Sequence, residues 1–260
     1  MSHSAHVPVP DWNQPIWRYM KWPRLIQMLE ANSLWFTRLE VLQDKFEGRI
    51  PKPNLRPSAQ LIAQQWPYLA HAVNGPELVA QAFKQAVDFA KPRHLVSCWY
   101  VGNDESADMW DAYGRAIGSV AIKTYAGALA LGLDHPGSPL ECFASKIQYI
   151  DHNKQPVDVH HFLGPFFSKG RKFGFEQELR FLIHTPQPVP DGLQVEVDLT
   201  KVSVDLFVRT GGRDGRLEKA RAVIAKHGLN WQIAPSAIRR RWWGGSKLIA
   251  VRRWLRPPTA

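Results

Sequence analysis

The sequence has 260 residues, of which 45% are hydrophobic and 22% charged, a composition typical of a globular chain that can bury a core. Seven of its 33 Lys and Arg residues and none of its 23 Asp and Glu residues lie from Arg239 onward, so most of the net charge of +10 belongs to a basic C-terminal tail. No stretch approaches the roughly 20 apolar residues of a membrane span, and Cys98 and Cys142 are too few for a disulfide framework. The N-terminus has no signal-peptide pattern, and we expect a reduced, cytoplasmic protein.

The predicted elements are strands with helices unevenly interspersed. Strands are expected at 15–22, 33–39, 94–101, 118–125, 142–151, 178–186 and 193–199, and the segment 202–236 predicts strand, glycine turn, helix and strand. Helices are expected at 23–32, at 104–116 and twice within 58–91, on either side of the sequence NGPE. This order predicts a single α+β domain at 16–238, with a mixed or antiparallel sheet core flanked by helices. An N-terminal extension at 1–15 precedes the domain, and the basic tail at 239–260 follows it.

The stretch FGFEQELRFLIHTP, residues 173–186, places charged residues at alternate positions of an apolar run. In a strand, Glu176, Glu178 and Arg180 would share one face. The opposite face would then be apolar and would carry Phe175, Leu179, Phe181 and Ile183. Two carboxylates on one face repel each other, so a cation, a substrate or solvent has to offset them. We expect this face to line a cleft.

Three further segments carry candidate side chains. Asp44 and Glu47 lie in the turn DKFEG after a predicted strand, where the alternative is a solvated turn. Alternation puts Ser97 and Trp99 on one strand face. Trp110 and Tyr113 share a helix face at i, i+3 spacing, as a core pair or as a stacking surface.

The spacing of the histidines and cysteines does not predict a metal site. His152, His160 and His161 have no recognised metal-ligand spacing, and the sequence contains no Cys/His quartet. No metal is therefore expected as a cofactor.

The order of these motifs resembles a bacterial family known as domain of unknown function 2971, over about residues 16–238. The residues that carry the resemblance are Arg18-Tyr19, Leu34-Trp35-Phe36-Thr37, Asp44 with Glu47-Gly48, Ser97-Cys98-Trp99, Met109-Trp110 with Tyr113, and Lys172 with Glu176, Glu178 and Arg180. The same order is similar, more distantly, to the ADP-ribosyltransferase fold. Those enzymes use a basic residue on a first strand, a Ser on a second and a Glu, often within E-x-E, on a later one.

This second resemblance implies an enzyme that uses NAD as its substrate and transfers ADP-ribose to a macromolecule, in a toxin or phage-defence setting. It implies that Glu178 and Glu176 are catalytic. The residues that it implies for NAD binding are Arg18, Tyr19, Ser97, Trp99, Trp110, Tyr113 and Arg180. A carboxylate near the sugar would stabilise the positive charge that develops when the nicotinamide–ribose bond opens. A cation would hold the pyrophosphate, and an aromatic ring would stack on nicotinamide.

The basic tail interleaves cations with tryptophan, a combination suited to phosphate contact and base stacking. Its candidate nucleic-acid-binding residues are Arg239, Arg240, Arg241, Lys247, Arg252 and Arg253. The acceptor of ADP-ribose would then be DNA or RNA, while packing of the tail on the domain is the alternative.

Two other functions remain open at this stage. In a metal-dependent nuclease, Asp44, Glu47 and Glu176 or Glu178 would bind Mg²⁺ through carboxylate oxygens. In a non-catalytic nucleic-acid-binding protein, a regulator or defence component, the acidic residues would only form ion pairs with Arg180 or Lys172.

Overall fold

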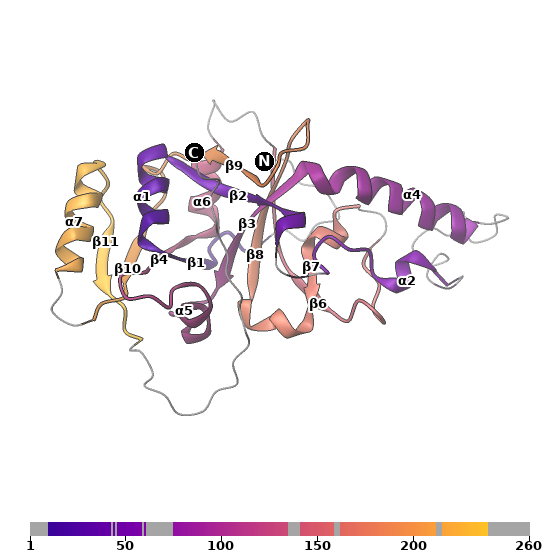
Figure 1. The fold of residues 1–260 in the computed structure, drawn as a ribbon, viewed down its shortest axis with the longest axis horizontal. Coiled ribbons are helices and arrows are strands. Elements are labelled where there is room, and N and C mark those ends of the chain that lie inside the picture. Colours follow the sequence, from indigo (N-terminus) through magenta and orange to yellow (C-terminus); the bar gives the residue numbers. More distant parts are fainter. Residues whose placement is uncertain are drawn as a thin grey trace.

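The computed structural model of the chain describes residues 10–42, 44, 46–58, 60, 75–134, 141–158, 162–211 and 215–238. Within these residues nine strands form one mostly antiparallel sheet, with helices packed on both of its faces (Figure 1). The predicted α+β class with a mixed, largely antiparallel sheet is confirmed. The basic tail from Arg239 and the first predicted helix of the segment 58–74 fall almost entirely outside the described residues.

The strand order of the sheet is β11-β10-β4-β1-β3-β2-β9, and β8 pairs with β3 and β5. These strands span Pro15–Met20 (β1), Ser33–Arg38 (β2), His94–Val101 (β3), Val120–Tyr125 (β4), Cys142–Lys146 (β5), Glu178–His184 (β8), Gly192–Glu196 (β9), Asp205–Val208 (β10) and Gln232–Pro235 (β11). Only the β10–β11 pair of this described sheet is parallel. The predicted strand 142–151 is in fact two: β6 (Gln148–Ile150) leaves the main sheet and pairs with β7 (Ser168–Gly170).

The helices cover both faces of the sheet, and hydrophobic clusters fill the space beneath them. On one face lie α1 (Trp22–Ala31), α6 (Ala126–Leu133) and α7 (Arg216–Lys226). On the other lie α4 (Gly75–Ala90) and α5 (Ala107–Tyr113). The described chain also contains short helical turns: α2 (Lys52–Leu55), η1 (Leu39–Val41), η3 (Lys91–Arg93), η4 (Gly164–Phe167) and η5 (Arg171–Glu176).

The sheet forks at β3. Along one edge β3 pairs with β8 at every residue from His94 to Tyr100. The other edge is shared, because β1 pairs with Tyr100 and Val101 whereas β2 pairs with Leu95 and Val96. Ser97, Cys98 and Trp99 therefore lie between the two arms, with no strand beside them on that edge. Each arm is held from outside, β1 by β4 and β2 by β9.

The predicted alternation of Glu176, Glu178 and Arg180 on one strand was wrong at its first residue. Glu176 ends the 3₁₀ turn η5, and Gln177 follows with a left-handed φ of 36°. The ladder with β3 ends at the pair Tyr100–Glu178. The Gln177 carbonyl still accepts from the Val101 N–H of β3 at 2.9 Å, and the backbone before it closes as a turn. Leu179, Phe181 and Ile183 do face the core as predicted, whereas Phe175 packs beside a different cluster, under α5.

Candidate functional site

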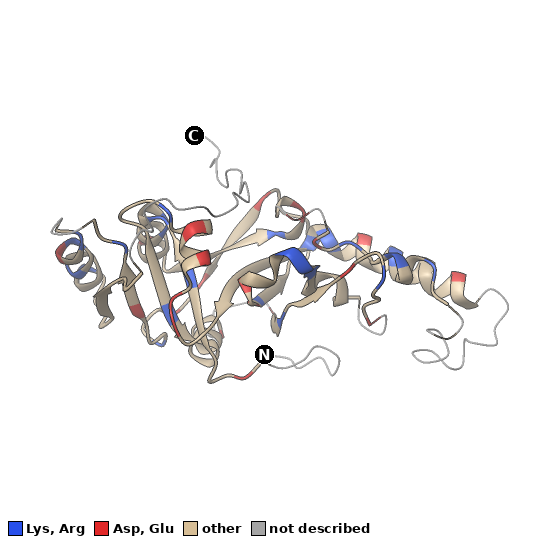
Figure 2. Ribbon diagram, turned by 90° about the horizontal axis from the view of Figure 1, so that it is seen from below, with Lys and Arg blue, Asp and Glu red and all other residues tan. Residues whose placement is uncertain are grey.

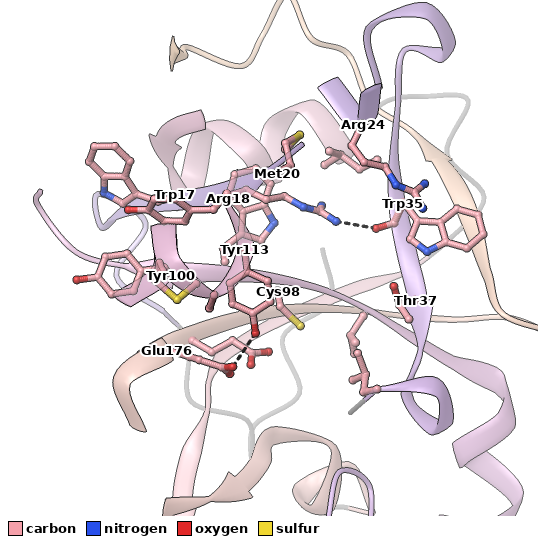
Figure 3. Close-up of a pocket in the computed structure, with 18 of the residues that line it drawn as sticks. Trp17, Arg18, Met20, Arg24, Trp35, Thr37, Cys98, Tyr100, Tyr113 and Glu176 are labelled. Carbon is pink, nitrogen blue, oxygen red and sulfur yellow. Dashed lines mark hydrogen bonds between the residues drawn. The ribbon is translucent and has the colours of Figure 1, made fainter. Parts of the chain in front are cut away.

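A cavity of about 430 Å³ opens at the fork (Figure 3). Its walls come from β1, the start of α1, β2, the middle of β3, α5, β7 and η5. Ligand pockets in proteins have volumes of about 300–1,000 Å³, so the space suits a small-molecule ligand. Cations gather at one end of this cavity and carboxylates at the other.

Arg18 of β1 is the central cation. Its Nη1 donates a hydrogen bond to Ser97 Oγ at 2.7 Å, and its Nη2 donates to the Trp35 carbonyl oxygen at 3.1 Å, so the side chain links both arms of the fork to β3. Burial lowers the pKa of Arg18 to about 10, and the neighbouring groups that act on this pKa are Cys98 and Arg24. No carboxylate within the described residues pairs with Arg18. A desolvated cation without an acidic partner favours the binding of an anion.

Two more cations stand at the same end. Lys21 and Arg24 line the cavity because α1 begins immediately after β1 and returns its first turn toward Arg18. Arg24 Nη1 donates to Gln27 Oε1 at 2.8 Å, and burial lowers the pKa of Arg24. This end of the cavity is therefore strongly cationic.

At the opposite end three carboxylates surround the ammonium group of Lys169, which is on β7. Lys169 Nζ lies 2.5 Å from Glu176, 2.9 Å from Glu47 and 3.3 Å from Glu178. The Tyr113 hydroxyl donates to Glu176 Oε1 at 2.7 Å, as Figure 3 shows. All four charged side chains are buried.

Arg180 completes this cluster from behind the cavity wall. Its Nε donates to Glu178 Oε1 at 2.7 Å, its Nη2 to Glu47 Oε2 at 2.8 Å and its Nη1 to the Phe166 carbonyl at 2.5 Å. The cations expected to offset the two acids are therefore Lys169 and Arg180. Because Glu47 is the third carboxylate, the cluster keeps one net negative charge.

The pKa values of the two acids respond differently to this environment. Burial alone would raise the pKa of Glu178, but Arg180 and Lys169 hold it at about 2, so this carboxylate is ionised at neutral pH. Burial raises the pKa of Glu176, which Lys169 offsets only in part. The three carboxylates raise the pKa of Lys169 well above its usual value despite burial, so its ammonium stays charged.

The two acids of the DKFEG turn have different roles. Asp44 holds the turn in place, and Glu47 belongs to the charged cluster. Asp44 accepts hydrogen bonds from the backbone N–H groups of Phe46 and Gly170 and so ties the turn to β7. Glu47 then reaches Arg180 and Lys169. Gly48 has φ +64°, and a Cβ there would lie 3.2 Å from Lys91 Cε, so glycine suits this position.

The residues implied for NAD binding separate into two groups. Arg18, Tyr19, Trp99 and Tyr113 line the cavity, as do both acids, Glu176 and Glu178. Ser97, Trp110 and Arg180 are buried behind its wall. Ser97 positions Arg18 and accepts the Trp99 indole N–H at 3.0 Å. Trp110 packs against Tyr19 with ring centroids 5.1 Å apart and donates to Glu105. The candidate residues of the tail, from Arg239 to Arg253, lie outside the described residues.

Sequence reasoning missed Lys169, Trp35 as a cavity residue, and the cations Lys21 and Arg24. A signal for Lys169 existed, since it is a lone charge in the apolar stretch PFFSKG. For Lys21 and Arg24 the signal was position alone, because they directly follow the first strand.

Compared with protein-family models and with curated proteins, the chain matches none. Two findings hold for the described part of the chain. It contains no group of three or more His, Cys, Asp and Glu side chains arranged to hold a metal ion. It also contains no helix that is long and apolar enough to cross a membrane.

Proposed function

We propose that the cavity binds NAD and that the protein is an ADP-ribosyltransferase-like enzyme. One observation carries this proposal: a single cavity joins Arg18, a desolvated cation with no acidic partner among the described residues, to the ionised carboxylate of Glu178. NAD needs both features, because its pyrophosphate is anionic and its nicotinamide–ribose end is cationic. The motif order that resembles the ADP-ribosyltransferases supports the same function.

At the cationic end, Arg18 would hold the pyrophosphate, with Lys21 and Arg24 beside it. Ser97 and the Trp35 carbonyl fix the Arg18 guanidinium before any ligand arrives. Such preorganisation lowers the entropy cost of binding.

At the acidic end, the bond between nicotinamide and ribose C1′ breaks, and its electron pair neutralises the pyridinium nitrogen. The positive charge moves to the ribose as an oxocarbenium ion, which a fixed carboxylate stabilises. Glu178 is suited to this role because Arg180 orients it and keeps it ionised. An acceptor nucleophile then attacks C1′ and loses its proton.

Tyr113 and Glu176 would form the acceptor side of this reaction. The Tyr113 hydroxyl holds Glu176 at the cavity wall, and the pKa of Glu176 is raised by burial. A carboxylate of raised pKa is the better proton acceptor, so Glu176 would take the proton of the attacking nucleophile.

The geometry gives less support to a nuclease that binds Mg²⁺ through these acids. The Lys169 ammonium already lies at hydrogen-bonding distance from Glu47 and Glu176 and at 3.3 Å from Glu178. The fourth acid, Asp44, is engaged with backbone N–H groups. A divalent cation would have to displace Lys169 and unmake these ion pairs.

Replacing Glu178 with Gln tests the proposed function. The E178Q variant keeps the side-chain shape but removes the negative charge, so nicotinamide release from NAD should fall by about a hundredfold or more. Affinity for NAD should change little, because the charge acts mainly as the bond opens. The measurement is nicotinamide release, together with equilibrium NAD binding for both proteins.

The E176Q variant is the comparison on the same cluster, and a smaller loss of release is expected there because the nucleophile loses its proton after the nicotinamide bond has opened. Melting curves of both variants check that the fold survives. Equal release by all three proteins, or no NAD binding by the wild type, would contradict the proposal.

A further inference from the structure

We propose that Trp35 is a stacking platform for the adenine base, so that the substrate is an adenine dinucleotide and not a nicotinamide mononucleotide. The proposal rests on the proposed function and adds to it a base-binding subsite at the end of the cavity opposite the carboxylates.

Trp35 faces the cavity and not the core. In β2 the alternate residues Ser33, Trp35 and Thr37 line the cavity. Their neighbours Leu34 and Phe36 are buried in the main hydrophobic cluster, and Leu34 also borders the cavity from there. Trp35 is only half-buried, and none of the three clusters found among the described residues includes it. A tryptophan outside the core that borders an empty space has a ring available for contact with a ligand.

Gly192 fixes where this ring lies. Trp35 pairs with Gln194 across β2 and β9, so Gly192 is its diagonal neighbour on the same face of the sheet. A Cβ on Gly192 would lie 2.6 Å from Trp35 Cζ2 and 2.3 Å from the Phe36 carbonyl oxygen. The indole therefore rests where only a glycine leaves room, and the backbone of β9 supports it.

The order of groups along the cavity matches the order of groups in a dinucleotide. Figure 3 shows Arg18 between Trp35 on one side and Glu176 with Tyr113 on the other, and Arg24 lines the same cavity. The Trp35 carbonyl on β2 accepts a hydrogen bond from Arg18 Nη2 on β1 at 3.1 Å, so the residue that carries the platform is in direct contact with the cation. A base on Trp35, a pyrophosphate on Arg18 and the nicotinamide ribose near Glu178 place the three parts of NAD in sequence.

Stacking supplies the affinity expected of this subsite. The stacking of one base on an aromatic side chain changes affinity by about tenfold to a hundredfold on alanine substitution. Gln194 and Ser33, hydrogen-bonded to each other beside the ring, offer polar groups to the edge of the base.

The experiment compares the equilibrium binding of NAD and of nicotinamide mononucleotide, which lacks the adenylate part, namely adenosine and one phosphate. The variants are W35F, which keeps an aromatic face, and W35L, which fills the space without one. W35L should weaken NAD binding about tenfold to a hundredfold and leave mononucleotide binding within about twofold. W35F should keep most of the wild-type affinity for NAD. W22A is the control, because Trp22 is also half-buried but does not line the cavity, and it should change neither affinity.

Two outcomes would contradict the proposed role of Trp35 in base stacking without contradicting the proposed function. One is W35L binding NAD as tightly as the wild type, and the other is wild type binding both ligands equally well. Absence of NAD binding and of nicotinamide release in the wild type would overturn the proposed function together with the platform. Melting curves for each variant separate a lost contact from a lost fold.

Discussion

Lys169 has the most heavily charged surroundings of the buried side chains described. Three carboxylates approach its ammonium group, and Arg180 lies on the far side of two of them. Removing one partner from such a group leaves a buried charge uncompensated, which is far more destabilising than the loss of a surface ion pair. The chain contains a surface pair for comparison, Lys84 with Asp88 on α4.

The K169M variant should therefore be less stable than the wild type by about 3–5 kcal/mol at pH 7. The matched variant K84M, which breaks the exposed pair, should lose less than about 1 kcal/mol. Urea unfolding of the three proteins measures both differences. Similar losses in the two variants would mean that the cluster contributes no more than a surface pair.

Part of this cluster was predictable from local sequence. Spacing in the stretch 173–186 grouped Glu176 with Glu178 and Arg180; Arg180 does pair with Glu178, whereas Glu176 joins them only through Lys169. Spacing missed the turn at Gln177, because the end of the partner strand decides where the strand begins. It also missed Lys169, whose place depends on the pairing of β6 with β7, a contact between segments that no local pattern specifies.

At the scale of elements, the junction between α4 and β3 depends on His94. The helix ends at Ala90, whose carbonyl oxygen lies 2.7 Å from His94 Nδ1. The ring also packs against Phe166 and His184, with centroids 5.2 and 4.9 Å away. Burial and the nearby His184 lower the pKa of His94 to about 4, although the hydrogen bond to the Ala90 carbonyl opposes them, so the folded protein holds this ring neutral at pH 7.

The direction in which stability changes with pH follows from the pKa of His94 in the folded protein and in the unfolded chain. In the unfolded chain a His titrates near 6.5, so at pH 5 the unfolded state binds the proton and the folded state does not. The stabilisation is complete above pH 6.5 and is lost as the pH falls toward 4. Between pH 7.5 and 5.0 His94 should contribute a loss of about 2 kcal/mol in the free energy of unfolding.

The H94Q variant isolates that contribution, since a Gln amide can still donate to the Ala90 carbonyl but does not titrate. Urea unfolding at pH 7.5 and 5.0 should show a smaller loss in H94Q than in the wild type, by about 2 kcal/mol. Equal losses in both proteins would show that His94 takes up its proton as readily in the folded state as in the unfolded chain.

The strands themselves were largely predictable, and their arrangement was not. Periodicity located β1, β2, β3 and β8 within a few residues. The sequences of those segments do not predict that β1 and β2 share one edge of β3. That arrangement depends on pairing with outer strands, β4 for β1 and β9 for β2. The cavity arises at the fork, so its position could not be predicted from sequence even though several of its residues were.

At the scale of the whole molecule, charge is distributed in two different ways. Figure 2 shows Lys and Arg interspersed with Asp and Glu along the described chain, in keeping with the nearly neutral balance of the first 238 residues. The tail has seven cations and no acid. Separation of a neutral body from a basic tail is typical of a protein whose tail contacts a polyanion.

The last described residues before the tail pack near α5, which forms part of the cavity wall. Ser236 Oγ and the Ala237 N–H both donate to Glu105, directly before α5. Ile238, the last described residue, packs beside the cluster of Trp17, Tyr19 and Trp110. Because α5 forms part of the cavity wall, Ile238 lies near the proposed NAD site.

Replacing Arg239, Arg240 and Arg241 with Ala should therefore weaken binding to single-stranded DNA or RNA and flatten its salt dependence. Each phosphate contact contributes about 0.7 to the slope of log K against log salt for a single strand, so three lost contacts should reduce that slope by about 2. The matched control replaces three exposed cations of α7, namely Lys219, Arg221 and Lys226, and should leave the slope nearly unchanged. Both triple variants lose the same net charge, so only a contact made by the tail distinguishes them. Equal slopes in the two variants would mean that the tail acts through net charge alone.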